Sequence, residues 1–302
     1  MILSGFMALH WDDARYFLAL ARTGQIGKAA ELLGVSNITL SRRLKQIQAE
    51  SVAPLWTRTR NGLELSDEGR RLVAYFERVE AELDAAQDFM AGQVSGEIAG
   101  TVRVAAPEGF VNQIVSPHLD AFVAAYPKLH LEIVPQTPGF SMSRRQADLA
   151  VMVGEPTEPE LAHEHLSDYG LGVYATASYL DAHGTPSTVE DLADHRLIGY
   201  VEDLLFSPRL NLQRSIWNQW TSNLSVYSPV AQVEAVSSGA GIGVLHTFLI
   251  RDRALVRILP DLKLTRAFYL VLHQNTTHVP RIQAALGFLR SLAQYIPDDV
   301  SP

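Results

Sequence analysis

The chain has 302 residues, a formal net charge of −8, 47% hydrophobic residues and no cysteine. This length is enough for two or more domains, and the lack of cysteine excludes disulfides, thiol nucleophiles and cysteine-zinc sites. No apolar run reaches the roughly 18–20 residues that span a bilayer, and residues 1–10 lack the basic and apolar regions of a signal peptide. We therefore expect a cytoplasmic protein without a membrane segment.

The first 50 residues predict three helices, the last two joined by a tight turn. Residues 11–22 have helical spacing, and residues 25–48 contain a helix with small residues, a glycine at position 34 and a polar-basic second helix. Glycine can stop the earlier helix, and Ser36 or Asn37 can cap the later one. We expect Ile38, Leu40, Leu44 and Ile47 to lie toward its packing side. The pattern predicts a helix-turn-helix whose second helix enters the DNA major groove, or alternatively a helix corner of an all-α protein.

The distribution of charge favours the DNA-binding interpretation over the alternative, despite the negative total. Residues 22–60 contain seven Lys or Arg and two acidic residues, whereas residues 61–91 contain three Arg and eight acidic residues. Local charge on the binding face governs attraction to phosphates.

A hairpin and a long helix follow. Asn61-Gly62 is typical of a type I′ turn between two short strands, and it predicts a wing that carries Arg58 and Arg60 toward the DNA backbone; the alternative is a hairpin with solvated arginines. Residues 67–90 then carry apolar residues at coiled-coil spacing, which favours a dimerisation helix over a helix packed on its own domain. The predicted dimer contacts are Leu72, Phe76, Val79, Leu83, Ala86 and Met90.

Beyond a glycine-containing linker at residues 92–100, strand and helix patterns alternate for about 200 residues, which predicts βαβ units, a mostly parallel sheet and room for two subdomains. The expected strands are 101–106, 129–135, 147–154, 171–174, 196–201 and 267–273, the main helices are 112–126 and 279–295, and 227–232 is expected to be extended.

Two segments have part of the composition of a chemical motif without its full pattern. The glycines between 239 and 243 lack the spacing of a dinucleotide loop, so we expect a turn there. His163 and His165 have no predicted partner cluster and are expected to be solvated, although two histidines at this spacing could bind a metal. No Ser-His-Asp set is suggested by spacing, so we expect no enzyme activity, no metal and no cofactor.

The order of these parts resembles the LysR-type transcriptional regulators over essentially the full chain. The matching segments are 29–36 with Ser41-Arg42, 54–58, 65–69, 100–104, Phe122 with 125–127, 147–150 and 238–243. The chain departs from the usual family pattern at Asn37, Ile38, Ile47-Gln48 and Trp56, so the resemblance leaves the operator sequence open.

The resemblance implies an α+β multidomain protein with an N-terminal winged helix-turn-helix (8–66), a linker helix (67–92) and a periplasmic-binding-protein-like α/β effector domain (93–302). It implies two effector-domain lobes, the first comprising 98–172 with 273–298 and the second 173–272. It further implies a homotetramer, built as a dimer of dimers, that binds an inverted repeat of double-stranded DNA and responds to a small molecule between the lobes. An activator of this kind would also contact RNA polymerase.

Two sets of residues are our candidates for these functions. The DNA-binding candidates are Lys28, Ser36, Asn37, Thr39, Ser41, Arg42, Arg43, Arg58 and Arg60, with Arg42 the best guanine-binding candidate. The effector candidates, expected at the C-terminal ends of strands, are Pro107, Glu108, Gly109, Phe110, Gln136, Thr137, Val201, Glu202, Asp203 and Phe206. The three acids among the latter favour a cationic effector. The competing hypotheses are a solute-binding transport protein with the same two-lobe fold and an enzyme on the α/β domain.

Overall fold

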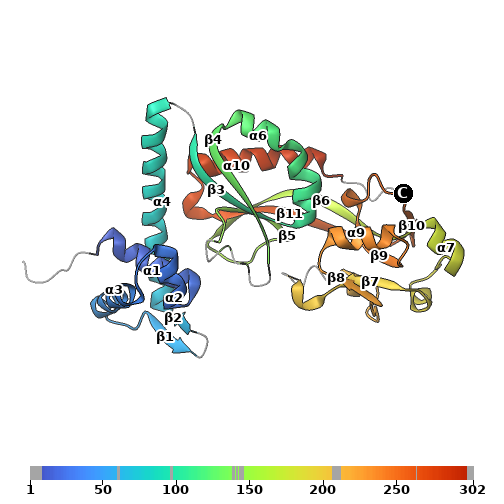
Figure 1. Ribbon diagram of the computed structural model, residues 1–302, viewed down its shortest axis with the longest axis horizontal. Coiled ribbons are helices and arrows are strands. Elements are labelled where there is room, and N and C mark those ends of the chain that lie inside the picture. The colour runs from blue at the N-terminus through green and yellow to red at the C-terminus, as the bar shows by residue number, and fades with distance from the viewer. Residues whose placement is uncertain are drawn as a thin grey trace, which may run out of the picture. The chain divides into compact units, whose positions relative to one another are not determined.

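The computed structural model describes residues 9–59, 62–95, 98–137, 140, 142, 146–205, 212–262 and 264–297. The chain forms two compact units, the first running to Gly96 and the second comprising nearly all residues from Glu97 onward (Figure 1). None of the helices in these ranges combines the length and the apolar character needed to cross a membrane.

The first unit is a three-helix cluster with a two-stranded wing and a long helix. Its elements are α1 (Trp11–Thr23), α2 (Ile26–Leu33), α3 (Asn37–Glu50), β1 (Trp56–Thr59), β2 (Gly62–Leu65) and α4 (Asp67–Ser95). Gly34 ends α2 in the left-handed conformation at φ 65°, and the Ser36 hydroxyl caps α3 by accepting a hydrogen bond from the Thr39 amide. The predicted helix-turn-helix is therefore present.

The packing face of α3 differs from the prediction at one residue. Leu40, Leu44 and Ile47 are buried against α1 and α2, whereas Ile38 is 82% exposed. Ile38 precedes Leu40 by two positions, which places it about 200° around the helix from the buried side. The expectation that Ile38 joins the packing face was wrong.

The wing is confirmed, and Gly62 of the predicted turn belongs to its second strand. Thr59 pairs with Gly62 at the end of the β1–β2 ladder, whereas Asn61, the other residue of the predicted turn, lies outside the described residues. Gly62 has φ 136°, and a Cβ there would lie 2.3 Å from the Gly24 carbonyl oxygen. The Leu63 amide donates to that same oxygen at 2.8 Å. The glycine therefore allows the wing to pack on the turn between α1 and α2.

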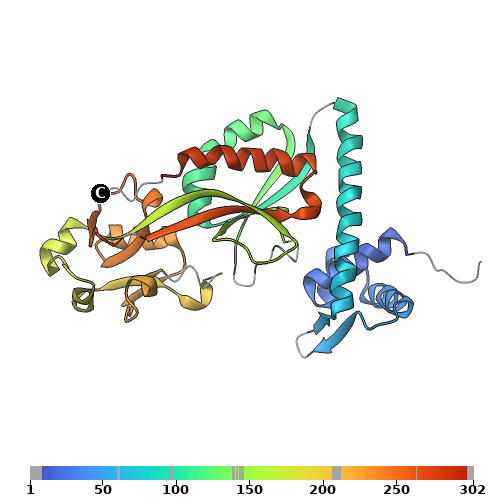
Figure 2. The same ribbon diagram turned by 180° about the vertical axis from the view of Figure 1, so that it is seen from behind.

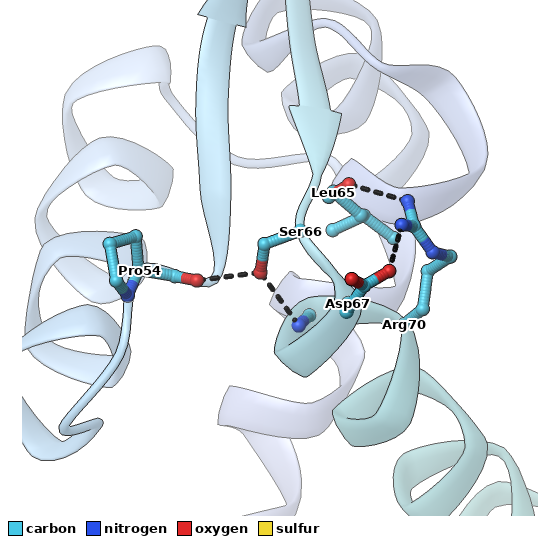
Figure 3. A network of polar contacts seen from close by, with 6 residues as sticks. Pro54, Leu65, Ser66, Asp67 and Arg70 are labelled. Atoms are coloured by element: carbon cyan, nitrogen blue, oxygen red, sulfur yellow. Dashed lines mark hydrogen bonds and ion pairs between the residues drawn. The ribbon is translucent and has the colours of Figure 1, made fainter.

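Ser66 connects the wing to α4 (Figure 3). The Ser66 hydroxyl donates to the Pro54 carbonyl at 2.6 Å and accepts from the Gly69 amide at 3.0 Å, so it caps α4 and ties the helix to the segment that leads into β1. Arg70 donates to the Leu65 carbonyl at 2.7 Å and pairs with Asp67. A Cβ on Gly69 would lie 2.0 Å from the Leu55 carbonyl oxygen, so only glycine fits at this position.

The long helix α4 packs through its first turns on the first unit's own core. Phe76 is 6% exposed and lies 5.8 Å from Phe17, and Arg22 forms a two-pronged ion pair with Glu80. Leu72 also packs against this core, so Leu72 and Phe76 serve intramolecular packing, unlike their predicted role in dimer contacts. Val79, Ala86 and Met90 are exposed, and Leu83 is half-buried. The helix also continues past the predicted end at residue 92 to Ser95.

The second unit contains one nine-stranded sheet. Its strands are β3 (Ala99–Ala106), β4 (Lys128–Pro135), β5 (Leu149–Val153), β6 (Leu161–Ala175), β7 (Leu197–Tyr200), β8 (Leu224–Val226), β9 (Ile242–His246), β10 (Val256–Ile258) and β11 (Leu264–His273). The order is β4-β3-β5-β11-β6-β9-β7-β8, with β10 beside β6. The pairs within β3–β5 and within β7–β9 are parallel, whereas the pairs made by β6 and β11 are antiparallel, so the sheet is mixed rather than mostly parallel.

The long strands β6 and β11 join the two parallel groups, β3–β5 and β7–β9, as a continuous ribbon (Figure 2). The helical segments are α5 (Glu108–Phe110), a π turn (Val111–Val115), a 3₁₀ turn (Ser116–His118), α6 (Leu119–Ala125), α7 (Ala177–His183), α8 (Gln213–Ile216), α9 (Pro229–Ser237) and α10 (Pro280–Ser291), with further 3₁₀ turns at Glu190–Asp194, Glu202–Leu204, Thr247–Leu249, Gln274–Thr276 and Leu292–Tyr295. Phe122 of α6 packs on Phe288 of α10 at 4.9 Å, and both helices cover the β3–β4 part of the sheet (Figure 1).

Two predicted elements of this unit need correction. Residues 229–232 begin helix α9 rather than extending, because Pro229 suits the first helical position and the Ser228 hydroxyl accepts from the Ala231 amide. The expected strand 171–174 is only the last part of β6, which begins at Leu161.

Candidate functional site

The N-terminal end of α3 presents the candidate DNA contacts of the first unit. Asn37, Ile38 and Arg42 are exposed, and Ser41 is half-exposed. Ser36 and Thr39 are committed to the cap, because their hydroxyl oxygens lie 2.8 Å apart and Ser36 also accepts from the Thr39 amide. Among the candidates on α3, Asn37 and Arg42 therefore offer the freest polar groups.

Arg43 differs from Arg42 because it points back to the protein. Its guanidinium lies 3.5 Å from the Asp13 carboxylate of α1, and its side chain is 35% exposed. Lys28 on α2 and Arg58 on β1 are exposed, as expected for phosphate contacts, and Arg60 lies outside the described residues. The ion pair makes positioning of α3 against α1 the more direct role of Arg43.

A cavity of about 450 Å³ lies in the second unit where strands from both parallel groups end. Pro107, Gln136 and Val153 come from the ends of β3, β4 and β5, and Tyr200 and His246 from the ends of β7 and β9. The described residues that line it are Pro107, Glu108, Gly109, Phe110, Pro135, Gln136, Thr137, Val153, Tyr169, Tyr200, Leu204, Leu205, Leu212, Tyr227, Ser228, Pro229, His246, Phe248, Leu249 and Phe268. Its size falls in the range of small-molecule sites.

Aromatic rings form much of the cavity wall. Tyr169 of β6 stacks on Phe268 of β11 at 4.2 Å and on His246 at 5.5 Å. Phe110 and Phe248 meet Phe268 edge-on at 5.0 and 5.9 Å. We call these five residues the aromatic cluster. It places flat apolar surfaces where the two long strands cross between the parallel groups.

Burial keeps three ionisable groups of the described wall, those of His246, Tyr200 and Tyr169, neutral near pH 7. Burial lowers the pKa of His246 to about 4, so its imidazole carries no charge. Burial raises the pKa of the Tyr200 hydroxyl, with neighbouring Tyr169 and Glu108 adding to the shift, and burial likewise raises the pKa of Tyr169 against the opposing charge of Arg266. Glu108, which is half-buried, is the single carboxylate among the lining residues that the structure describes, and none of these is Lys or Arg.

Three buried polar atoms at this wall have no hydrogen-bond partner among the described residues: Gln136 Oε1, the Tyr200 hydroxyl and His246 Nδ1. Gln136 is fixed by its amide nitrogen, which donates to the Val151 carbonyl at 2.7 Å and leaves the oxygen as an acceptor. Buried polar groups are normally paired, so such a group at a cavity invites a ligand or a water molecule.

The structure brings six of the predicted effector residues together at this cavity: Pro107, Glu108, Gly109, Phe110, Gln136 and Thr137. Val201, Glu202 and Asp203 instead line a second hollow, where Glu202 pairs with Arg214 at 2.9 Å. Phe206 lies outside the described residues. Of the three acidic residues on which the expectation of a cationic effector was based, only Glu108 is among the described residues that line the main cavity.

Sequence reasoning missed Tyr169, Tyr227, His246, Phe248 and Phe268. The rule that ligands bind beyond strand ends would have indicated His246, which ends β9, and Tyr227, which follows β8. No local pattern indicated Tyr169 and Phe268, since they meet only through the β6–β11 pairing.

The histidine pair on β6 is occupied by carboxylates. His163 lies 2.9 Å from Glu155, and His165 lies 2.8 Å from Asp168. Within the described parts of the chain, no group of three or more His, Cys, Asp or Glu residues is placed to hold a metal ion.

Comparisons with known proteins agree with this two-part organisation. The model of the LysR substrate binding domain matches residues 95–294, and that of the bacterial regulatory helix-turn-helix protein, lysR family, matches residues 11–70. The transcriptional regulator PtxR of Pseudomonas aeruginosa is 31% identical over 291 residues, which cover 93% of this chain and 91% of PtxR. CrgA of Neisseria meningitidis serogroup C is 29% identical over 196 residues, which cover 65% of each chain.

Solved structures show the same fold. The structure of CrgA from N. meningitidis has a TM-score of 0.58 at 24% identity and covers 95% of this chain and 99% of that one. Full-length LysG from Corynebacterium glutamicum, solved with bound effector Arg, has a TM-score of 0.69 at 16% identity and covers 96% and 100%.

Proposed function

The chain belongs to the LysR family of bacterial transcriptional regulators, and we propose that it reads DNA with the N-terminal end of α3 and alters that binding when a small molecule fills the cavity of the second unit. The observation that carries this proposal is the capped, exposed end of α3 beside a wing with an exposed Arg58. Arg42 would contact a base edge, while Lys28 and Arg58 would contact phosphates.

Mobility shifts with DNA flanking the protein's own gene test this function directly. We expect a specific complex that weakens steeply with salt, because phosphate contacts release counterions. Arg42→Ala should reduce the preference for the operator over unrelated DNA, whereas Arg58→Ala should weaken binding to both alike. A wild-type chain that binds operator and unrelated DNA equally at every salt concentration would contradict the proposal.

We further propose that the DNA-bound form is a dimer of dimers on an inverted repeat, and that the exposed part of the α4 seam contacts a second copy. Val79 is 46% and Met90 70% exposed, and both have coiled-coil spacing. Val79→Glu with Met90→Glu should shift the mass in sedimentation toward the monomer, whereas Ala74→Glu, exposed on α4 but about 140° around the helix from Val79, should leave it unchanged. An unchanged mass in both variants would contradict this assignment.

In this proposal the chain acts by binding in the cytoplasm and without catalysis, as its relatives named transcriptional regulators suggest. If it activates transcription, RNA polymerase is the expected partner. Transcription in vitro from the operator-bearing promoter, with and without the protein, distinguishes activation from repression.

A further inference from the structure

We propose that the cavity of the second unit binds an uncharged aromatic molecule of one or two rings that carries a hydrogen-bonding group. This inference rests on the proposed function, because it names the chemical class of the effector for that same cavity.

The aromatic character follows from the shape and chemistry of the wall. The aromatic cluster of Phe110, Tyr169, His246, Phe248 and Phe268 supplies ring faces and edges, and aromatic rings pack on such surfaces in offset or edge-on geometry. Leucines complete much of the remaining wall at Leu204, Leu205, Leu212 and Leu249. A cavity of about 450 Å³ has room for such a molecule.

The lack of charge follows from what the described wall offers an ion. A carboxylate would find no Lys or Arg among the described lining residues, and buried His246 is neutral near pH 7. Among those same residues an amine would find one carboxylate, that of Glu108, which is half-buried at the end of β3. Removing an ion from water without a matched partner is unfavourable, so a neutral molecule should bind more tightly than either ion of the same shape.

The hydrogen-bonding group follows from the unpaired atoms at the wall. Gln136 Oε1 needs a donor, while the Tyr200 hydroxyl can donate or accept by rotating its proton. A ligand amide or hydroxyl group would supply such a partner, whereas a pure hydrocarbon would leave these groups unpaired.

A panel of ligands that are similar in shape but differ in charge, titrated into the full-length protein, tests the inference. Benzamide, benzoate and benzylamine share one ring and differ in charge, and naphthamide, naphthoate and naphthylmethylamine repeat the comparison with two rings. Calorimetric titration should show that at least one amide binds about tenfold or more tightly than its charged partners. Tighter binding of a carboxylate or an amine, or no binding by either amide, overturns the inference.

Two variants tie the result to this cavity. Thr137 is exposed at the cavity, so Thr137→Lys should fold normally and shift the preference toward the carboxylate, whereas Thr137→Gln should keep the preference for the amide. Mobility shifts without ligand separate the two levels of the proposal. Specific operator binding by a protein that ignores both amides refutes the ligand class only, whereas absence of specific operator binding refutes the proposed function.

A second, independent observation concerns Ile38, and we infer that this side chain reads a thymine methyl group. Ile38 is 82% exposed at the second position of α3, and Arg42 lies on the same side one turn later. The neighbouring Ser36 and Thr39 hydroxyls are paired with each other, so Ile38 is the prominent side chain between Asn37 and Arg42. The thymine C5-methyl is the apolar group that base pairs present in the major groove.

Replacing thymines by deoxyuridine removes this methyl group without changing the base pairing. The operator is first located by footprinting. Within one of its half-sites, replacing one particular thymine should then weaken binding of the wild-type protein roughly fourfold, which is the change in affinity expected for losing one buried methyl-sized group. Ile38→Ala should bind both DNAs equally, whereas Ile38→Val should retain most of the difference. A wild-type protein that is indifferent to every such replacement, or an Ile38→Ala variant that keeps the difference, overturns the inference.

Discussion

Ser66 offers a direct test of how the wing and α4 are joined. Ser66→Ala removes two hydrogen bonds together, the one donated to the Pro54 carbonyl and the one accepted from the Gly69 amide (Figure 3). Loss of a helix N-cap costs about 1 kcal/mol, and loss of an ordinary hydrogen bond adds about 0.5–1.5 kcal/mol. Because the Pro54 carbonyl is exposed and water can replace its partner, we expect a total of about 1–2 kcal/mol.

Two further variants separate these contributions. Ser66→Asp keeps a capping oxygen but cannot donate to Pro54, so it should show only the smaller loss. Ser66→Thr keeps both groups and should behave like the wild type.

Hydrogen–deuterium exchange of the full-length protein measures the effect locally. In Ser66→Ala, amides 69–72 should exchange roughly 5- to 30-fold faster, the ratio for 1–2 kcal/mol. Helix α10 belongs to the other unit and should exchange at an unchanged rate. Unchanged exchange at 69–72 in Ser66→Ala, or equal acceleration in Ser66→Thr, would show that this junction is not held by the hydroxyl.

Three more outcomes are expected from the packing and the buried ionisable groups. Gly69→Ala should destabilise the first unit by about 1–3 kcal/mol through its clash with Leu55, whereas Gly27→Ala, with no atom within 4 Å of the added Cβ, should stabilise it by up to about 1 kcal/mol in thermal unfolding. Phe76→Ala should cost about 3–5 kcal/mol in urea unfolding, whereas exposed Met90→Ala should stay within about 0.5 kcal/mol for the monomer. His246 has a folded-state pKa of about 4, below the unfolded value of 6.5, so the unfolded chain binds more protons between these values; stability should fall as the pH drops through this window, by up to roughly 3 kcal/mol, and His246→Phe should flatten that slope.

Local patterns in the first unit predicted most of its structure because each depends on neighbours in the sequence. Leu40, Leu44 and Ile47 follow helical spacing, and all three are buried. Ile38 is exposed although it is hydrophobic, because its position on the helix lies about 200° from that of Leu40. The spacing of Phe76 predicted a dimer contact, whereas its side chain is buried within one chain. Apolar residues have the same spacing in a coiled-coil seam and in a helix that packs on its own domain, so spacing alone does not distinguish the two.

The second unit was less predictable where strand pairing is distant in sequence. The first half of β6 carries His163, Glu164 and His165, a polar run whose composition is typical of a solvated loop. Each of these side chains forms an ion pair with a residue that sequence alone does not identify; the partners are Glu155, Arg290 and Asp168, respectively. The sequence also could not distinguish the two hollows beyond β7. Tyr200 lines both of them, whereas Glu202 and Asp203, which follow it closely in the chain, line only the second. A residue's position after a strand therefore predicts the neighbourhood of the cavity but not the side from which its side chain contributes.

The aromatic cluster links ligand chemistry to the architecture of the second unit. Tyr169 and Phe268 stack at 4.2 Å on β6 and β11, the strands that join the two parallel groups. Glu108, Gly109 and Phe110 contribute from the β3 group, while His246 and Phe248 contribute from the β9 side. A ring bound among them would therefore contact both groups and the ribbon between them. Binding would favour the spacing of the two groups at which both contact the ring most closely. A ligand shifts the equilibrium between two conformations of a protein only when its contacts differ between those conformations. The rings of an uncharged aromatic ligand suit this role, since their contacts with both groups depend on close packing.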